Sequence, residues 1–276
     1  MTVIQHIAAF TDQGTGGNPA GVVIGDVLPT AERMQKIAAE VGFSETVFSA
    51  PQADGWITRY YSPETEVPFC GHATIALGAA LAQAHGPGRY RLHLSEGEIE
   101  VEASEEDGRA RATLTSLPTN SSPFPSPLVD EALTLFGYSR DDLDTDLFPR
   151  RMNAGAEHLF VALNSRERLS AMAYDLEAGR AFMRRHGFVT IALVWREADA
   201  LFHARNAFAS GGVLEDPATG AAAAALGGVL RDGGVITEGQ FTILQGRDMG
   251  RPSRLVVCVG NQIGSPVYVS GEASPM

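Results

Sequence analysis

Apolar positions recur at two spacings along the chain, and these predict alternating helices and strands. Met34, Ile37 and Ala38 lie three or four residues apart or adjacent on one helical face, which predicts a helix over 29–41 that ends at Gly42. The other amphipathic helices are predicted over 130–136 and 175–186. Short apolar runs bounded by turn residues predict strands at 3–10, 22–24, 43–48, 56–61, 90–94, 99–103, 110–114, 158–163, 189–195, 201–206, 239–245, 253–259 and 266–271.

Two further helices differ from these because almost all of their residues are small. They are predicted over 72–84 and 217–230, and each follows a turn that contains glycine. Asp216 and Pro217 mark the start of the second one, since proline is favoured at the first helical position. Their alanine-rich sequences predict helices that are buried on all sides. The N–H groups at the start of such a helix can bind an anion.

The order of strands, turn, small-residue helix and strands occurs twice, around His72 and around Asp216. This repeat predicts an α+β fold of two pseudo-duplicated domains, each a mixed or antiparallel sheet curled around a central helix. The two helix N-termini are expected to face each other across a cleft. The expected boundaries are 1–117 for the first domain, 128–263 for the second, 116–127 for a proline-rich linker, and 264–276 for a strand that packs back on the first domain. Hairpin turns are expected at 96–97 and 107–108.

Composition narrows the class of protein. The 276 residues include 33 acidic and 21 basic side chains, a net charge of −12, so no nucleic-acid partner is expected, because phosphate binding needs a basic face. The N-terminal segment has neither a basic region nor a long apolar run, and no stretch reads as a membrane span. A cytoplasmic protein with no membrane contact is therefore expected. Cys70 and Cys258 are too few for a disulfide framework.

Three side chains are candidates for proton chemistry: Glu45, His72 and Asp216. Alternation along the strand 43–48 places Glu45 on the same face as Val47. A carboxylate on an apolar face is costly to ionise, which suits a general acid or base; the alternative is an exposed or edge position. His72 falls at a helix start, where neutral imidazole is expected. Asp216 could equally be an ordinary capping residue.

The segment Cys70-Gly71-His72 allows two other chemistries. Cysteine and histidine both ligate zinc, but the sequence offers no further ligand nearby, so no metal is expected. Cys70 could act as a nucleophile beside a base, although a buried, inert thiol is the simpler interpretation. The glycine-rich stretch 14–17 lacks the spacing of a nucleotide-binding loop, so no cofactor is expected there.

Five motifs, in this order, resemble those of the PhzF-like family, the phenazine-biosynthesis isomerases that form a branch of the diaminopimelate-epimerase fold. They cover nearly the whole chain and are Gly-Asn-Pro-Ala at 17–20, Ser-Glu-Thr at 44–46, Pro-Phe-Cys-Gly-His-Ala-Thr at 68–74, Glu-Asp-Pro-Ala-Thr-Gly at 215–220, and the segment 245–253 with Gln-Gly and Gly-Arg-Pro-Ser. The resemblance implies two similar domains with the active site between them, no cofactor, no metal, and commonly a homodimer.

The resemblance also implies a role for individual residues. Glu45 would shuttle a proton, assisted by His72 and Asp216, on a small carboxylate-bearing substrate. The residues that would bind this substrate are Asn18, Ser44, Gly71, Ala73, Thr219, Gly220 and Ala221. Family members usually carry serine where this chain has Ala221, so a hydroxyl near the ligand is lost. The resemblance therefore implies the type of reaction more firmly than the substrate.

These observations predict a cofactor-independent isomerase that moves a proton on a small carboxylate in a cleft between two domains. One alternative is a non-catalytic binding protein that keeps the fold, for which Ala221 is the only support. Another is a thiol-dependent epimerase or racemase that uses Cys70. Related two-thiol enzymes need a second cysteine, and the segment 217–220, where it is expected, contains none.

Overall fold

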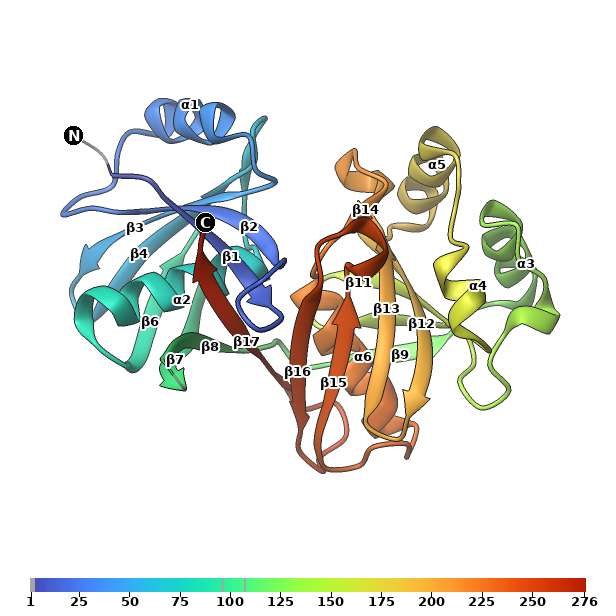
Figure 1. Ribbon diagram of the computed structural model, residues 1–276. Helices are drawn as coiled ribbons and strands as arrows, with labels where there is room; N and C mark the ends of the chain where they lie inside the picture. The colour runs from blue at the N-terminus through green and yellow to red at the C-terminus, as the bar shows by residue number, and fades with distance from the viewer. Residues whose placement is uncertain (1–2, 96, 107) are drawn as a thin grey trace. The chain divides into compact units, whose positions relative to one another are not determined.

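The computed structural model describes residues 3–95, 97–106 and 108–276 (Figure 1). It divides into two compact units. Unit 1 comprises the described residues up to Thr115 together with Ser270–Met276, and unit 2 comprises Ser116–Val269. The hairpin turns expected at 96–97 and 107–108 each include a residue outside the described part of the chain. Every helix of the described part is too short or too polar to cross a bilayer.

Unit 1 is built on a sheet that closes on itself. β1 pairs with β2, β2 runs parallel to β3, β3 pairs with β4, β4 runs parallel to β6, and β6, β7 and β8 are antiparallel neighbours. β17 pairs with both β8 and β1 and so completes the ring. The bounds are β1 Gln5–Thr11, β2 Asn18–Ile24, β3 Thr46–Gln52, β4 Gly55–Tyr61, β5 Glu66–Val67, β6 Gly88–Leu94, β7 Gly97–Glu106, β8 Arg109–Thr115 and β17 Tyr268–Pro275.

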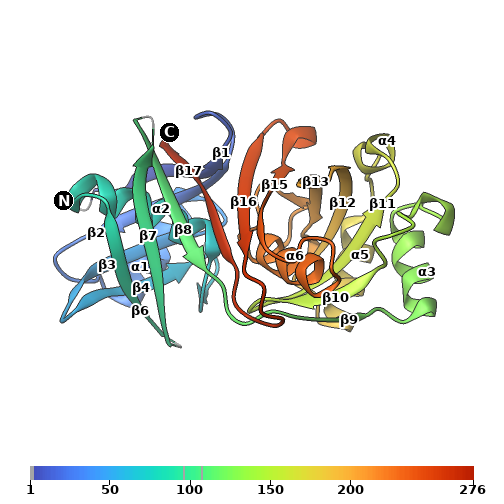
Figure 2. The same cartoon turned by 90° about the horizontal axis from the view of Figure 1, so that it is seen from below.

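The first small-residue helix, α2 (Gly71–His85), lies inside this ring (Figure 2). It contacts β1, β2, β3, β6, β7 and β8, and every residue from His72 to Leu81 is buried. The prediction of a helix buried on all sides is therefore confirmed. α1 (Ala31–Val41) packs on β3 and β4 instead and buries Met34 and Ile37.

Gly78 allows α2 to approach the sheet closely. A Cβ atom at this position would lie 2.8 Å from Val101 Cγ2 and 3.0 Å from Ala112 Cβ. Gly78→Val should therefore lower the free energy of unfolding by about 3 kcal/mol, because the strands would have to move to admit the side chain. Gly88→Val in β6 is the control, since a Cβ atom there would meet nothing within 4 Å beyond its chain neighbours. Urea unfolding of both variants checks this, and equal stabilities would contradict it.

Unit 2 repeats the same topology around the second small-residue helix, α6 (Gly220–Asp232). β10 pairs with β11, β11 runs parallel to β12, β12 pairs with β13, β13 runs parallel to β15, and β15 pairs with β16. This is the pairing sequence of β1, β2, β3, β4, β6 and β7. The bounds are β9 Asn120–Pro123, β10 Arg150–Asn153, β11 Glu157–Leu163, β12 Thr190–Ala198, β13 Leu201–Ala207, β14 Glu215–Asp216, β15 Gly239–Gln245 and β16 Ser253–Val259.

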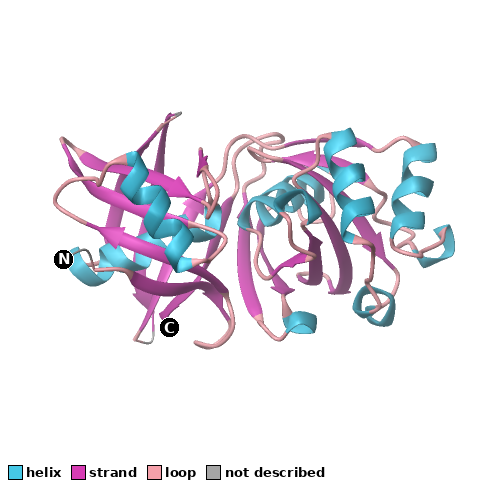
Figure 3. Ribbon diagram, turned by 90° about the horizontal axis from the view of Figure 1, so that it is seen from above, coloured by secondary structure: helices cyan, strands magenta, loops and turns pink. Residues whose placement is uncertain are grey.

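Three helices cover the face of this sheet opposite α6 (Figure 3). They are α3 (Ser126–Leu135), α4 (Arg166–Ser170) and α5 (Leu176–His186). Their apolar side chains, including Leu133, Phe182 and Met183, share one core with Leu159 and Leu193 of the sheet. Because side chains alternate along a strand, the intervening residues of β11 and β12 take the other face.

Two sequence-based predictions about unit 2 are wrong, and some of its elements were missed. The segment 116–127 is not a free linker, because β9 pairs with β10 and α3 already begins at Ser126. β10 and α4 were not predicted, since β10 is a polar strand at 150–153 and α4 is too short for a helical period. α6 begins at Gly220 rather than at Pro217, because Glu215 and Asp216 pair with β13 and Thr219 is the N-cap.

Burial of His158 in β11 should make folding depend on pH. Desolvation lowers the pKa of His158 from 6.5 to about 4 in the folded state. Below pH 6.5 the unfolded chain binds a proton here that the folded chain does not, so the contribution to stability is complete above pH 6.5 and is lost as the pH falls towards 4. The shift corresponds to about 3 kcal/mol. Urea unfolding at pH 7.5 and 4.5 checks this: His158→Gln should lose less stability between these pH values than the wild type.

Candidate functional site

The candidate catalytic side chains of unit 1 gather at the start of α2. His72 Nε2 lies 3.4 Å from Glu45 Oε2 and 3.4 Å from Ser44 Oγ. On its other side, Cys70 Sγ lies 3.3 Å from His72 Nδ1. The side chains of His72 and Glu45 are only 8% and 16% exposed, so the pair is largely shielded from water. Glu45, His72 and Ser44, which the sequence analysis singled out, therefore lie together.

Glu45 reaches this place from a position that the sequence analysis did not expect. It lies immediately before β3, which begins at Thr46, and not inside a strand over 43–48. Its carbonyl oxygen accepts a hydrogen bond of 3.2 Å from Gly21 N–H, where β2 and β3 begin to run side by side. Residues 46–50 of β3 are all buried, so alternation carries no information about the face that Glu45 takes.

The backbone around Cys70 presents the N-terminus of α2. Cys70 is the N-cap, with an extended backbone (φ −146°, ψ 117°), and its carbonyl oxygen accepts hydrogen bonds from Thr74 N at 3.0 Å and Thr74 Oγ1 at 2.7 Å. Tyr60 Oη lies 2.7 Å from Thr74 Oγ1. Burial raises the pKa of the Tyr60 phenol, so it stays neutral and holds this turn as a fixed donor. The first N–H groups of α2, those of Gly71, His72 and Ala73, have no carbonyl partner inside the helix and can hold an anion.

Three side chains of this cluster have the chemistry of metal ligands. A carboxylate oxygen of Glu45, Cys70 Sγ and a ring nitrogen of His72 lie within 4.8 Å of one another. The sequence predicts no metal, because it offers no further ligand next to Cys70 and His72, but the fold brings Glu45 to that place. These three residues could therefore hold a divalent ion, and the absence of a metal from the reaction stays a prediction.

Two other predicted site residues of unit 1, Asn18 and Ala73, are buried in the fold. Asn18 is buried at the first position of β2, opposite Ala9 of β1. Ala73 is fully buried in the first turn of α2.

In unit 2, Asp216 lies in β14 and its carboxylate is tied to the start of α6. Asp216 Oδ2 accepts a hydrogen bond from the hydroxyl of the N-cap residue Thr219. Gly220 and Ala221 are the first two residues of the helix. Asp216 is therefore not the capping residue itself, as the pattern around Pro217 suggested, but it contacts the residue that is.

Gln245, at the end of β15, holds both ends of this turn. Its Nε2 donates to the carbonyl oxygen of Asp216 at 2.7 Å and to Thr219 Oγ1 at 3.1 Å, and its Oε1 accepts from Thr219 N at 3.4 Å. The next residue, Gly246, has φ 74°, and a side chain there would lie 2.7 Å from the carbonyl oxygen of Pro217. The two turns thus fit together only with glycine at this position.

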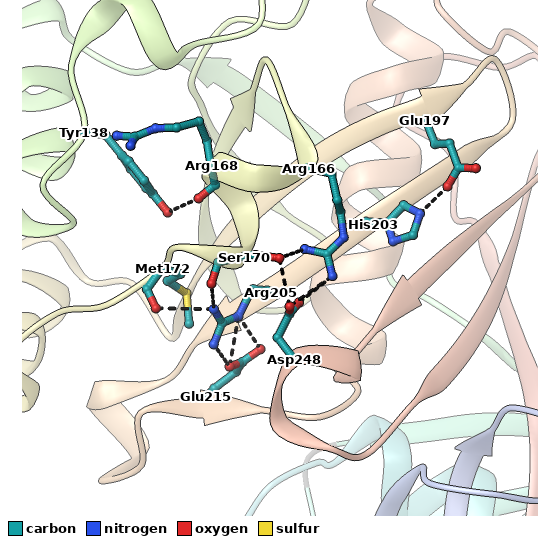
Figure 4. A network of polar contacts seen from close by, with 10 residues as sticks. All are labelled: Tyr138, Arg166, Arg168, Ser170, Met172, Glu197, His203, Arg205, Glu215 and Asp248. Carbon is teal, nitrogen blue, oxygen red and sulfur yellow. Dashed lines mark hydrogen bonds and ion pairs between the residues drawn. The ribbon is translucent and has the colours of Figure 1, made fainter.

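The other residue of β14, Glu215, forms an ion pair with Arg205 that holds this strand in place (Figure 4). Arg205 Nη2 donates to Glu215 Oε2 at 2.6 Å, and Arg205 Nη1 donates to the carbonyl oxygens of Ser170 and Met172. The side chains of Arg205 and Glu215 are 11% and 6% exposed. This pair therefore anchors the strand that carries Asp216 in a dry environment.

A neighbouring group holds the turn that follows Gln245. Asp248 accepts hydrogen bonds from Arg166 Nη2 at 2.8 Å and from Ser170 Oγ at 3.0 Å (Figure 4). Burial opposes ionisation of Asp248, but the hydrogen bonds from Arg166 and Ser170 outweigh it and hold its pKa below the usual value. Asp248 is therefore ionised at neutral pH and keeps the turn in place.

The repeated topology shows which residues of the two units occupy equivalent positions. Tyr60 pairs with the second residue of β5, Val67, as Asn206 pairs with the second residue of β14, Asp216. Two N-caps are then equivalent, Cys70 in unit 1 and Thr219 in unit 2.

Continuing this register, Tyr61 pairs with Thr46 as Ala207 pairs with Ile191. The residues before these partners, Glu45 and Thr190, are therefore equivalent. In the same way His72 corresponds to Ala221, each being the second residue of its helix. Unit 2 thus lacks the titratable groups that form the cluster of unit 1.

Sequence reasoning did not assign a role to Gln245, Asn206 or Arg205. Gln245 lies inside a recognised motif, which was a usable signal. Asn206 and Arg205 are polar residues in a strand that also contains Leu201, Phe202 and Ala204, and a buried position for such polar residues usually means a defined hydrogen-bond partner.

Comparison with known proteins places the chain in a family. The family model described as "Phenazine biosynthesis-like protein" matches residues 7–276. The chain belongs to the phenazine biosynthesis-like protein family. Among its relatives, the trans-2,3-dihydro-3-hydroxyanthranilate isomerase of Pseudomonas aeruginosa is 31% identical over 277 residues, which cover 97% of this chain and 95% of the relative. A Bacillus subtilis protein named "Uncharacterized isomerase YfhB" is 31% identical over 277 residues, which cover 95% of this chain and 92% of the relative.

The relatives are isomerases, and this member of the family is one as well. Solved structures confirm the epimerase-like α+β fold. A PhzF-family protein of Bacillus anthracis has a TM-score of 0.88 at 23% identity and covers 100% of this chain and 97% of its own. A hydroxyproline epimerase of Agrobacterium vitis has a TM-score of 0.66 at 12% identity and covers 100% of this chain and 89% of its own.

Proposed function

We propose that the protein is a cofactor-independent isomerase that moves a proton on a small carboxylate-bearing substrate. The observation that carries the proposal is the contact of Glu45 with His72 at the N-terminus of α2, at 3.4 Å. A carboxylate beside a helix N-terminus combines a base with a site for negative charge. Family membership supports the reaction class.

In the proposed reaction, Glu45 takes a proton from a carbon of the substrate, and the electron pair of the broken C–H bond delocalises towards an electron-withdrawing group. The N-terminus of α2, from Gly71 onwards, stabilises the developing negative charge. Glu45 then returns the proton to a different carbon. His72, in contact with the carboxylate, orients Glu45 and exchanges a hydrogen bond with it as its charge changes.

The residues of unit 2 are proposed to complete the site in a cleft between the two units. Asp216, Thr219 and Gly220 would bind the part of the substrate that does not react, and Asn18 and Ser44 would contact it from unit 1. The support is that α6, like α2, is a buried helix of small residues with an acid at its start, Asp216 at α6 and Glu45 at α2.

The substrate is proposed to differ from that of the Pseudomonas aeruginosa relative in the group that faces Ala221. This position usually carries a serine in the family, and the methyl group of alanine cannot donate a hydrogen bond. A substrate that lacks a hydrogen-bond acceptor at this place would lose nothing by the change.

Solvent-proton exchange tests the proposed function. The protein is incubated in D2O with a panel of small unsaturated or hydroxylated carboxylates that includes trans-2,3-dihydro-3-hydroxyanthranilate, and deuterium uptake is followed by mass spectrometry. At least one compound should gain deuterium on carbon. Binding without exchange across the panel would favour the alternative of a non-catalytic binding protein.

A thiol mechanism is the second candidate, because Cys70 Sγ lies 3.3 Å from His72 Nδ1. An imidazole at this distance could accept the thiol proton. The mechanism predicts that iodoacetamide inactivates the protein, that substrate protects it, and that Cys70→Ser is inactive. Full exchange activity in Cys70→Ser would leave Glu45 as the proton carrier.

A further inference from the structure

A chain of buried hydrogen bonds crosses the sheet of unit 2 and ends on the carboxylate of Asp216. His158 Nδ1 lies 2.8 Å from Thr190 Oγ1, which donates to Asn206 Oδ1 at 2.9 Å. Asn206 Nδ2 donates to Gln245 Oε1 at 3.5 Å, the longest link. Gln245 then donates to Thr219, which donates to Asp216. β11, β12, β13 and β15 each contribute one residue between 158 and 245. His158 lies directly opposite Thr190, whereas the next two contacts are diagonal, since Asn206 pairs with Ala192 and Gln245 pairs with Ala204.

The donors along this chain all point the same way. The hydroxyl of Thr190 donates to Asn206, so Thr190 must accept from His158, which fixes the proton of the neutral imidazole on Nδ1. His158, Thr190, Asn206 and Gln245 are each at most 2% exposed. Hydrogen bonds aligned in this way in a dry interior polarise one another and strengthen the last one, on the carboxylate.

The chain is suited to hold Asp216 and not to conduct protons. Two of its links are carboxamides, which would have to pass through a high-energy tautomer to transfer a proton. Its first residue, His158, also has no neighbour in the described part of the chain from which to take up a proton. The far ring nitrogen, Nε2, is buried without a hydrogen-bond partner among the described residues. Protonating that nitrogen would bury an unpaired charge.

The repeated fold shows which residues of unit 1 the hydroxyl groups of this hydrogen-bond chain replace. Thr190 occupies in unit 2 the place that Glu45 occupies in unit 1, and Thr219 occupies that of Cys70. A titratable acid and thiol in one unit thus correspond to two neutral hydroxyls in the other, and both hydroxyls are links of the chain.

We propose that His158, Thr190, Asn206 and Gln245 form a positioning chain that fixes the Asp216 carboxylate and the start of α6. Thr190 and Thr219, the unit 2 counterparts of Glu45 and Cys70, then hold Asp216 in place, whereas the cluster of unit 1 transfers the proton. The effect on catalysis rests on the proposed function, in which Asp216 binds substrate. The effect on Asp216 itself does not.

Thr190→Val tests the proposal, because it removes one hydroxyl that is four hydrogen bonds away from the Asp216 carboxylate and keeps the shape of the side chain. NMR follows the side-chain amide of Gln245 and the carboxyl carbon of Asp216 in the protein without ligand. Both resonances should shift in Thr190→Val and return in Thr190→Ser. Thr58→Val, which removes a buried hydroxyl bonded to Ser49 in unit 1, should leave them unchanged. Wild-type resonances in Thr190→Val would overturn the proposal.

The kinetic arm uses the compound that exchanges deuterium in the wild type. Thr190→Val should lower kcat/KM about tenfold through displacement of Asp216, and Thr190→Ser should restore it. Asn206→Leu breaks the hydrogen-bond chain at its next residue and should lower kcat/KM in the same way. The test therefore stands even if Thr190→Val folds poorly. If the wild type exchanges with no compound, the proposed function fails, and the NMR comparison still decides whether the chain positions Asp216.

Discussion

Replacing Glu45 with glutamine should reduce deuterium exchange by about a thousandfold or more, because general acid–base catalysis typically contributes two to four orders of magnitude. Glutamine keeps the size and the hydrogen-bonding reach of the side chain but cannot accept a proton from carbon. The contact with His72 at 3.4 Å can still form. Substrate binding, measured by calorimetry, should therefore change little.

The matched control for this variant is Glu40→Gln in α1. Glu40 is an acid of the same unit, its side chain is 56% exposed, and its ion pair with Lys36 is a long one at 3.8 Å. It should retain full exchange and full stability. Undiminished exchange in Glu45→Gln would remove Glu45 from the mechanism and leave Cys70 as the candidate acid or base.

Glu215→Gln should lower the free energy of unfolding by about 3 kcal/mol, because it removes the carboxylate that contacts the buried guanidinium of Arg205 and leaves Asp248 as the remaining acid that acts on it. Arg205 Nη2 and Glu215 Oε2 are 2.6 Å apart, and the two side chains are 11% and 6% exposed. Since Glu215 precedes Asp216 in β14, the exchange activity should fall as well. Urea unfolding at pH 7.5 measures the loss of stability.

The repeated fold supplies a control for this prediction. Arg59 and Glu66 occupy in unit 1 the positions of Arg205 and Glu215, but they lie 3.6 Å apart and are 24% and 41% exposed. Glu66→Gln should therefore cost at most about 1 kcal/mol. Equal losses in the two glutamine variants would show that burial does not determine the strength of these pairs.

The two central helices could be predicted from sequence because their small residues leave no polar face. α2 and α6 are long enough for their runs of small residues to be recognised in the sequence, and both helices are buried as expected. The repeat followed from them, since two such helices in 276 residues each need a sheet to cover them. Glu45, His72 and Asp216 were singled out because each lies at a strand end or helix start close to a glycine.

What could not be predicted depends on strand register. Glu45 is brought to His72 by the point at which β3 begins, and the start of α6 is moved from Pro217 to Gly220 by the pairing of β14 with β13. The links from His158 to Gln245 are 32, 16 and 39 residues apart in the chain. No local pattern marks such partners, because only the alignment of four strands makes them neighbours.

The closure of the unit 1 ring has a consequence for the order of synthesis. β17 consists of residues 268–275, yet it pairs with β1, which comprises residues 5–11 and is made long before it. Unit 2 is continuous, from Ser116 to Val269, and lies between the two segments of unit 1 in the chain. Unit 1 must keep the edges of β1 and β8 open until β17 has been made. Most of unit 1 is therefore made before unit 2, yet its sheet can close only after unit 2 has been made.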